Sequence, residues 1–189
     1  MPSKVIVAVT GASGSIYAKH LLDRLTKLKD KPEEISVIFS ENGKKVWEYE
    51  IGNITYDSKA IHEYGFNDFF APVASGSAGY DCMVIIPCSM GTLGRIASGT
   101  SDDLISRAAD VMLKERKKLI LVTREAPLNL IHIENMKTIT LAGGIIYPAN
   151  PSFYSRPNSK EELEFTVVNR VLDILGFESD LKRWGVNSK

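Results

Sequence analysis

The residues best suited to chemistry in this chain form a small polar turn near its middle. The turn is Cys88-Ser89-Met90-Gly91-Thr92, and it follows the apolar residues 83–86, which predict a buried strand. We expect Pro87 to end that strand, because proline has no N–H to donate to a neighbouring strand. A helical pattern begins at Leu93, and the free N–H groups of a helix start favour an anion. Since the hydroxyl groups of the turn could add donors, the stretch predicts an anion site.

A second polar turn, Gly11-Ala12-Ser13-Gly14, follows the expected first strand at residues 4–10. Glycine turns of this kind bind phosphates in many α/β proteins, but one such turn is a weak signal. It is similar to the start of short-chain NAD(P) dehydrogenases, yet no tyrosine in this chain has a lysine four residues later. Ser40 also follows the strand expected at 35–39, where a dinucleotide fold places an acidic residue for the ribose. A hydroxyl there suits a flavin ribityl chain or a phosphate better than an adenosine ribose.

Strand and helix patterns alternate along the chain and define the expected fold. They predict a single domain over residues 1–189 with a C-terminal tail from about residue 176. The expected architecture is a three-layer, Rossmann-like, doubly wound α/β fold with a mostly parallel sheet and helices on both faces. A helix capped by Ser101 or Asp102 should run to Lys114, and a short strand is expected near Phe69-Phe70. The other expected elements are strands 4–10, 35–39, 83–86, 119–122 and 145–147, and helices 16–28, 41–51, 129–142 and 161–175.

Ligands of such a sheet bind beyond the carboxyl ends of its strands. Polar residues just past those ends should therefore converge on one rim, and they are Ser13, Ser40, Ser89, Arg124, Glu125 and Tyr147. Cys88 could be a nucleophile there, because a helix start lowers a thiol pKa, but a small buried cysteine is the plainer interpretation. Trp184 in the tail could fill a gap in the core or line a pocket.

Composition argues against several classes of function. Lys and Arg together number 23 and Asp and Glu also 23, so no basic field suggests nucleic acid. No apolar stretch approaches the length that spans a membrane, and nothing at the N-terminus predicts a signal peptide. Cys82 and Cys88 are expected to stay reduced, as in a cytoplasmic protein. His132 and Glu134 point different ways on one helix, so we expect no metal site.

Taken together, these motifs resemble the UbiX family of flavin prenyltransferases over nearly the whole chain. The family's Arg-Glu-Thr-Pro stretch has alanine in place of threonine here, outside the charged pair. The stretches that carry the resemblance are Thr10-Gly11-Ala12-Ser13-Gly14, Pro87-Cys88-Ser89-Met90-Gly91-Thr92-Leu93, Ser106-Arg107-Ala108-Ala109-Asp110-Val111, Leu113-Lys114-Glu115-Arg116, Arg124-Glu125-Ala126-Pro127-Leu128 and Phe153-Tyr154-Ser155-Arg156-Pro157.

The resemblance implies a metal-independent alkyl transfer that joins a dimethylallyl group from dimethylallyl phosphate to N5 and C6 of reduced FMN. Prenylated FMN would then serve a UbiD-type decarboxylase. The implied catalytic residues are Glu125, Glu50 and Ser13, although Glu50 could equally be a glutamate on a helix surface. FMN would be held by Gly11, Ala12, Ser13, Ser40, Ser89, Met90, Gly91, Thr92 and Arg124. The prenyl donor would be held by Tyr154, Arg170, Arg107, Lys114 and Tyr80.

Two other functions stay open at this point, an FMN-dependent cysteine-type decarboxylase and a non-enzymatic flavin carrier. The decarboxylases share the fold, but this chain has no histidine in its loop at 74–79 and no Pro-x-Met-Asn-x-x-Met-Trp substrate clamp. The resemblance also implies a homo-oligomer such as a dodecamer. Arg107 and Lys114 lie two turns apart on one expected helix, so either their long side chains converge on one phosphate or neighbouring subunits contribute to it, and the resemblance favours a site shared between subunits.

Overall fold

The computed structural model describes residues 1–56 and 60–180, and a six-stranded sheet forms its centre. The strands pair in the order β3-β2-β1-β4-β5-β6, and every neighbouring pair is parallel. The expected doubly wound fold is confirmed, and the sheet is parallel throughout rather than mostly parallel. The strands are β1 (Lys4–Val9), β2 (Glu34–Phe39), β3 (Ile61–Tyr64), β4 (Cys82–Cys88), β5 (Lys118–Thr123) and β6 (Ile145–Pro148).

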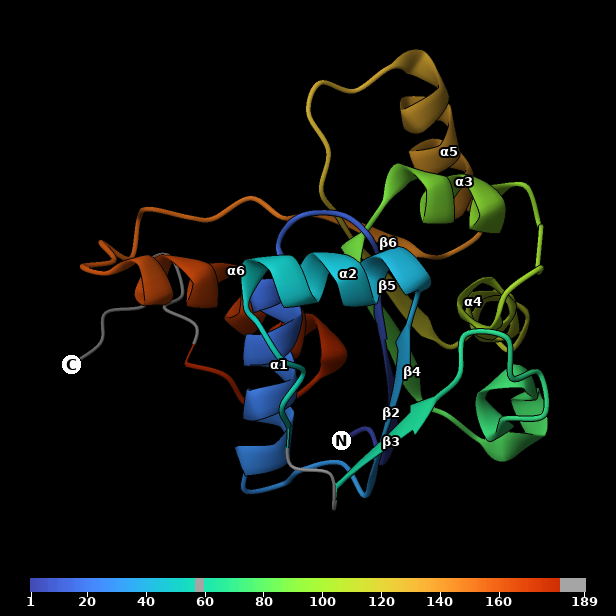
Figure 1. The fold of residues 1–189 in the computed structure, drawn as a ribbon, viewed down its shortest axis with the longest axis horizontal. Coiled ribbons are helices and arrows are strands. Elements are labelled where there is room, and N and C mark those ends of the chain that lie inside the picture. The colour runs from blue at the N-terminus through green and yellow to red at the C-terminus, as the bar shows by residue number, and fades with distance from the viewer. Residues whose placement is uncertain (57–59, 181–189) are drawn as a thin grey trace.

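Helices cover both faces of the sheet. Figure 1 shows α1 and α6 together on one side, and α3 and α5 together on the other. Within the part of the chain that the structure describes, no helix is both long and apolar enough to cross a membrane. The helices on the first face are α1 (Ser15–Lys27), α2 (Glu41–Glu50) and α6 (Lys160–Leu175). Those on the second are α3 (Met90–Ala97), α4 (Leu104–Lys114) and α5 (Leu130–Leu141), with the short 3-10 helices η1 (Pro72–Ala74) and η2 (Gly76–Ala78) before β4.

The central strand β1 shows why the two helical layers need apolar strands. Val5, Val7 and Val9 pack into the core under α1 and α6, whereas Ile6 and Ala8 pack into the core under α3 and α4. Successive side chains of a strand point to opposite faces, so a strand between two helical layers must be apolar at every position. All five side chains are fully buried. The apolar run of β1 therefore places it at the centre of the sheet.

The order of the strands reverses beside β1, which lies between β2 and β4. Because the strands are parallel, the turns that follow β1 and β4 lie side by side at the same edge of the sheet. The crevice at such a switch point is where doubly wound folds bind their ligands. The fold thus brings together the two polar turns, residues 10–14 and 88–92.

The sequence predicts that the strand β4 ends before Pro87, but in the structure it does not. It continues to Cys88, which pairs with Thr123 of β5 after a register shift that begins beyond Ile85. Pro87 lies in this irregular stretch, where its missing N–H costs no regular ladder hydrogen bond. The prediction is wrong because a register shift, unlike a regular ladder, accommodates proline inside a strand.

Two other local predictions are also wrong. The short strand expected near Phe69 is instead β3, while Phe69 and Phe70 lie in an exposed turn. The helix α4 is capped by Asp103 rather than by Ser101 or Asp102, because the Asp103 carboxylate accepts the Ser106 N–H at 2.8 Å. Trp184 lies outside the described residues.

Candidate active site

Thr10 joins the two polar turns at the carboxyl edge of the sheet. Its hydroxyl donates to the carbonyl oxygen of Pro87 at 2.7 Å and accepts the N–H of Ser89 at 2.8 Å. Thr10 is 1% exposed, so these hydrogen bonds form away from water and fix the geometry firmly. Thr10 is absent from the site residues expected from the sequence, although it stands between β1 and the glycine turn. It determines how closely the two turns approach each other.

A cavity of about 420 Å³ opens beside these turns, where α2, α3 and α4 begin. Helix starts present unpaired N–H groups and a partial positive charge, so the cavity suits a phosphate or another anion. Its lining residues are Gly11, Ser40, Glu41, Asn42, Phe66, Ser89, Gly91, Thr92, Arg95, Asp102 and Asp103.

Many of the residues expected to hold FMN line this cavity. Ser40 caps α2 by accepting the Gly43 N–H at 3.0 Å, and Ser89 caps α3 by accepting the Thr92 N–H at 3.3 Å. A hydroxyl that accepts keeps its own proton, so Ser40 can still donate to a ligand oxygen. Ala12 and Met90 are not among the lining residues, and their side chains are largely buried. The expected residues that line the cavity are Gly11, Ser40, Ser89, Gly91 and Thr92.

Two glycines allow the first turn of α2 to lie against the end of β1. A Cβ atom at Gly43 would stand 2.4 Å from the carbonyl oxygen of Val9. A Cβ atom at Gly11 would stand 2.7 Å from the Cβ of Asn42. Both distances are too short for real atoms, so any larger residue must push α2 away. The absence of these side chains therefore determines the shape of the cavity.

Arg95 lines the cavity but is absent from the residues expected from the sequence. Its Nε atom lies 3.2 Å from Asp103 Oδ2 and 3.7 Å from Asp102 Oδ1. One terminal nitrogen donates to Thr92 Oγ1 at 3.4 Å. Arg95 follows Thr92 by three residues on α3, a spacing that puts both side chains on one helix face. That spacing is the sequence signal that could have identified it.

The N-terminus of α1 differs from those of α2 and α3, because a carboxylate of this chain binds its free N–H groups. Glu50, at the end of α2, accepts the N–H of Gly14 at 3.0 Å and the N–H of Ser15 at 2.9 Å. Burial raises the pKa of the Glu50 carboxyl, but hydrogen bonds from Ser13, Gly14 and Ser15 outweigh burial and lower the pKa overall. Glu50 is therefore ionised at neutral pH and, in this arrangement, a weak proton acceptor. A catalytic role for Glu50 stays a prediction.

Arg124 and Glu125 line a separate cavity of about 270 Å³ beyond the ends of β5 and β6. The backbone N–H of Arg124 donates to the carbonyl oxygen of Cys88 at 3.3 Å, which ties this loop to the turn after β4. Glu125 is exposed, and its Oε1 atom accepts the N–H of Ala126 at 3.1 Å. The structure thus places a carboxylate and a guanidinium on adjacent residues at the rim, as expected from the sequence.

Tyr154 and Arg170 belong to a cluster of phenols and guanidinium groups near α1. Burial raises the pKa of Tyr147. The charges of Tyr154 and Tyr17 raise this pKa further, and the charge of Arg170 lowers it. Burial and the Glu164 carboxylate raise the pKa of Tyr17 as well, with Arg124 opposing the shift. Such electrostatic effects weaken with distance, so the groups named lie near one another. Tyr154 and Arg170 thus lie near Tyr147, a residue of β6.

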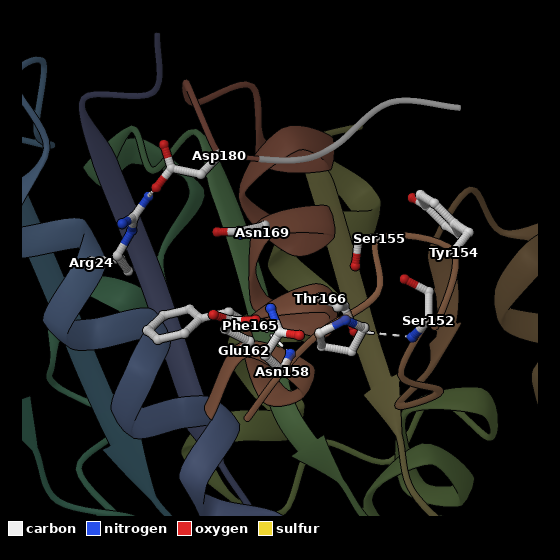
Figure 2. A pocket seen from close by; sticks show the side chains of 11 residues that line it. Arg24, Ser152, Tyr154, Ser155, Asn158, Glu162, Phe165, Thr166, Asn169 and Asp180 are labelled. Carbon is white, nitrogen blue, oxygen red and sulfur yellow. Dashed lines mark hydrogen bonds and ion pairs between the residues drawn. The ribbon is translucent and has the colours of Figure 1, made fainter. Parts of the chain in front are cut away.

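Tyr154 also lines a third cavity, of about 330 Å³, between α1, α6 and the loop at 152–158. Figure 2 shows Arg24 and Phe165 on its α1 side, and Ser152, Ser155 and Tyr154 on its loop side. Arg170 is not among its lining residues. This cavity shares no lining residue with the one where α2, α3 and α4 begin, so the two are distinct.

Tyr80 lies at the opposite edge of the sheet, so its predicted place beside the prenyl donor is wrong for this chain. Tyr80 is 2% exposed, and its hydroxyl bonds with Ser36 Oγ at 2.7 Å and with Glu34 Oε1 at 2.5 Å. Tyr80 precedes β4, and the amino ends of parallel strands all meet at the edge away from the rim. Burial and the Glu34 hydrogen bond raise the pKa of Tyr80, so it stays a neutral core residue.

Arg107 and Lys114 contact residues of this chain that do not line the cavities described above. Arg107 Nε donates to the carbonyl oxygen of Ala74 at 3.1 Å, and its guanidinium pairs with Asp110 at 3.0 Å. Lys114 pairs with Glu115. Because α4 leads away from the rim, Lys114 at its end lies farther from the rim than Asp103. Neither residue lines the three cavities described above.

Cys88 is fully buried, as its plainer interpretation predicts. Burial raises the pKa of its thiol to about 12, which opposes a role as a nucleophile. Cys82 is also buried, and both thiols are free. Among the described residues, no group of three or more His, Cys, Asp or Glu side chains gathers closely enough to hold a metal ion.

Comparison with known proteins identifies the family. A family model for flavoproteins matches residues 2–167. The flavin prenyltransferase UbiX of Methanocaldococcus jannaschii is 47% identical over 185 residues, which cover 96% of this chain and 98% of that protein. The crystal structure of AnUbiX (PadA1) in complex with FMN and dimethylallyl pyrophosphate has a TM-score of 0.89 and 40% identity, covering 98% of this chain and 99% of that one.

A third relative is a dodecameric FMN-dependent UbiX-like decarboxylase from Escherichia coli O157:H7. Its crystal structure has a TM-score of 0.88 and 38% identity, with 97% of this chain and 100% of that chain covered. Likeness in sequence and in fold thus extends over nearly the full length of each protein. The chain belongs to the flavoprotein family and, within it, to the UbiX flavin prenyltransferases.

Proposed function

We propose that this chain transfers a dimethylallyl group from a dimethylallyl phosphate to reduced FMN. As a UbiX flavin prenyltransferase, it is a transferase that acts on FMN. FMN supplies the accepting atoms N5 and C6, and the phosphate of the donor leaves. The prenylated FMN then serves a separate decarboxylase of the UbiD type. We also propose a cytoplasmic location, which the two free buried thiols support.

The cavity where α2, α3 and α4 begin is the observation that carries this proposal. Its backbone N–H groups, its hydroxyls and one guanidinium are the donors that a phosphate and a ribityl chain require. Gly11 and Gly43 keep its wall close to β1, where a side chain would fill the space. The residues present therefore fit the ribityl phosphate of FMN. We assign the flavin ring to the neighbouring rim, between Ser13 and Arg124.

Glu125 is the residue to which we assign proton transfer. Forming a bond at C6 requires loss of a proton, and a carboxylate at the rim can accept it. Glu125 is exposed and, among the described residues, its carboxylate accepts the adjacent Ala126 N–H, whereas Glu50 is bound to the start of α1. Ser13 also bonds to Glu50, so it positions that carboxylate. Glu50 is therefore the second choice for the proton transfer.

Tyr154 and Arg170 are the residues to which we assign the phosphate of the prenyl donor. Arginine binds phosphate with paired N–H groups, and a phenol adds one more donor. Arg107 and Lys114 would reach this phosphate only from a neighbouring copy, because within one chain they contact Ala74 and Glu115. The dodecameric relative supports such an assembly. We therefore propose a homo-oligomer that shares its active sites between subunits.

A direct test is to incubate the protein without oxygen with reduced FMN and dimethylallyl phosphate, and with the pyrophosphate in parallel. We expect the flavin mass to increase by one five-carbon unit, with one phosphate or pyrophosphate released per flavin. FMN binding without any mass increase would instead identify a flavin carrier. Release of CO₂ from a cysteine-terminated peptide, with unmodified flavin, would identify a decarboxylase.

The same assay tests the assignment of Glu125. The substitution Glu125→Gln keeps the shape of the side chain but cannot exchange a proton, which typically costs about 10²–10⁴-fold in rate. The matched control is Glu134→Gln, an exposed glutamate on α5 that pairs with Lys137. Wild-type rates in Glu125→Gln, with FMN still bound, would move the proton transfer to Glu50 or to the departing phosphate.

A further inference from the structure

Arg95 supplies the guanidinium of the cavity where α2, α3 and α4 begin. Its Nε edge is held by two carboxylates, with Asp103 Oδ2 at 3.2 Å and Asp102 Oδ1 at 3.7 Å. The Asp103 side chain is only 5% exposed, and its other oxygen caps α4 through the Ser106 N–H. Asp103 is thus fixed by the fold, and it fixes the Nε edge of the guanidinium in turn.

The opposite edge of the guanidinium lies along the first turn of α3. One terminal nitrogen donates to Thr92 Oγ1 at 3.4 Å, and the other stands 4.0 Å from where a Cβ of Gly91 would be. Both Gly91 and Thr92 line the cavity. A guanidinium has five N–H donors, and this arrangement leaves the terminal fork beside the cavity wall. Such a fork matches the geometry of two phosphate oxygens.

The charges around the cavity make this one arginine important. The acidic lining residues are Glu41, Asp102 and Asp103, while Arg95 is the basic residue among those that line it. A phosphate there cannot be held by an excess of positive charge. It must be held by aimed donors, namely helix N–H groups, hydroxyls and the guanidinium fork. Removing Arg95 would delete two such donors and leave Asp102 and Asp103 without their cation.

We propose that Arg95 binds the terminal phosphate of FMN and so selects the phosphorylated flavin over riboflavin. This inference rests on the proposed function, because it assumes that the ribityl phosphate occupies the cavity at the start of α3. It adds a specificity residue to the family motif, one turn beyond Thr92. Asp103 acts through Arg95 and is a positioning residue.

The test compares FMN with riboflavin, two ligands that differ only in the phosphate. For Arg95→Gln we expect FMN affinity to fall about 10–100-fold, as loss of a hydrogen bond to a charged group implies. Riboflavin affinity should change by less than about twofold, since riboflavin lacks the phosphate that the terminal nitrogens would bind. Arg95→Lys keeps the charge without the fork and should recover part of the FMN affinity. Flavin fluorescence titration measures all of these affinities.

Two further variants separate ligand binding from support of the fold. Arg116→Gln removes the same charge from an exposed position outside the cavity and is the matched control. Asp102→Asn removes a negative charge from the cavity while Asp103 still orients the guanidinium, so FMN affinity should hold or rise. Equal losses for both flavins in Arg95→Gln, or no loss for either, would overturn the inference. Failure of the wild-type protein to bind FMN would instead contradict the proposed function itself.

Discussion

The N-termini of α1 and α3 have similar sequences, but a side chain of the protein occupies the first and a cavity lies at the second. Both follow a central parallel strand, and both contain small and hydroxyl residues. At α1 the N–H groups of Gly14 and Ser15 donate to Glu50, a carboxylate of this chain. At α3 the cap is the hydroxyl of Ser89, and the start opens into a cavity of about 420 Å³. One start is filled by the protein, and the other offers its charge to a ligand.

This difference shows how the molecule keeps an anion in one place. Two adjacent open helix starts would compete for the same phosphate, because each carries the same partial charge. Glu50 removes α1 from that competition and leaves the start of α1 to a neutral or hydrogen-bonding group. Under the proposed function, the phosphate of FMN would therefore lie at α3 and the uncharged ring beside Ser13. Four substitutions test this division, from the largest expected effect to the smallest.

Ser89→Asp should close the open start. Aspartate caps a helix as well as serine does, and its charge suits the dipole, so the free protein should keep or slightly gain stability. A fixed carboxylate about 4 Å from a phosphate costs about 4 kcal/mol at an effective dielectric constant of 20, so FMN affinity should fall more than 100-fold. Thermal melting and FMN titration of the same preparation measure both effects. Undiminished FMN affinity would place the phosphate elsewhere.

Gly43→Ala should deform the open start without changing its charge. The new Cβ would stand 2.4 Å from the Val9 carbonyl oxygen, so α2 must move away from β1. Such overpacking typically costs about 1–3 kcal/mol in stability. FMN affinity should fall with it, because Ser40 moves with α2. Gly65→Ala is the control, since a Cβ there meets no atom closer than 3.8 Å. Urea unfolding of both variants checks the expected difference, and equal stabilities would contradict it.

Ser13→Asp should have the opposite effect on the free protein from Ser89→Asp. Ser13 bonds to Glu50, so aspartate there replaces a hydrogen bond with a second carboxylate. Exposed like charges at about 4 Å repel by about 1 kcal/mol, so the free protein should lose stability. FMN binding should also weaken. The double variant Ser13→Asp with Glu50→Gln should regain the stability lost to repulsion. If Ser13→Asp melts at the wild-type temperature, Glu50 does not occupy the start of α1 in solution.

Glu50→Gln should give the smallest change in stability, and this change should depend on pH. The pKa of Glu50 is lowered from its ordinary value of 4.5, so its charge stabilises the folded state above that pH. That stabilisation is lost as pH falls through the lowered pKa. For an exposed carboxylate at a helix start we expect about 0.3–1 kcal/mol at pH 7 and low salt. The stability difference between wild type and variant should shrink toward zero in acid, and a constant difference at every pH would contradict this account.

Much of the fold could be predicted from the sequence because its signals are local. Alternating apolar runs and helical patterns, glycine turns and capping residues such as Ser40, Ser89 and Ser159 act within a few residues of themselves. Pro87 misled the prediction of β4, because a register shift against β5 depends on a strand that comes much later in the chain. Tyr80 misled the prediction of the site, because its contacts with Ser36 and Glu34 are tertiary.

By itself, the sequence determined the doubly wound fold, the two polar turns and the rim on which they meet. Only the tertiary structure decided which turn is open, since Glu50 reaches Gly14 from the far end of α2. It also decided that Arg95 faces the cavity, because Asp103 at the start of α4 holds its Nε edge. Periodicity and turn chemistry act between near neighbours in the chain. The charge and hydrogen-bonding state of a site depend on partners that only folding brings within about 3 Å.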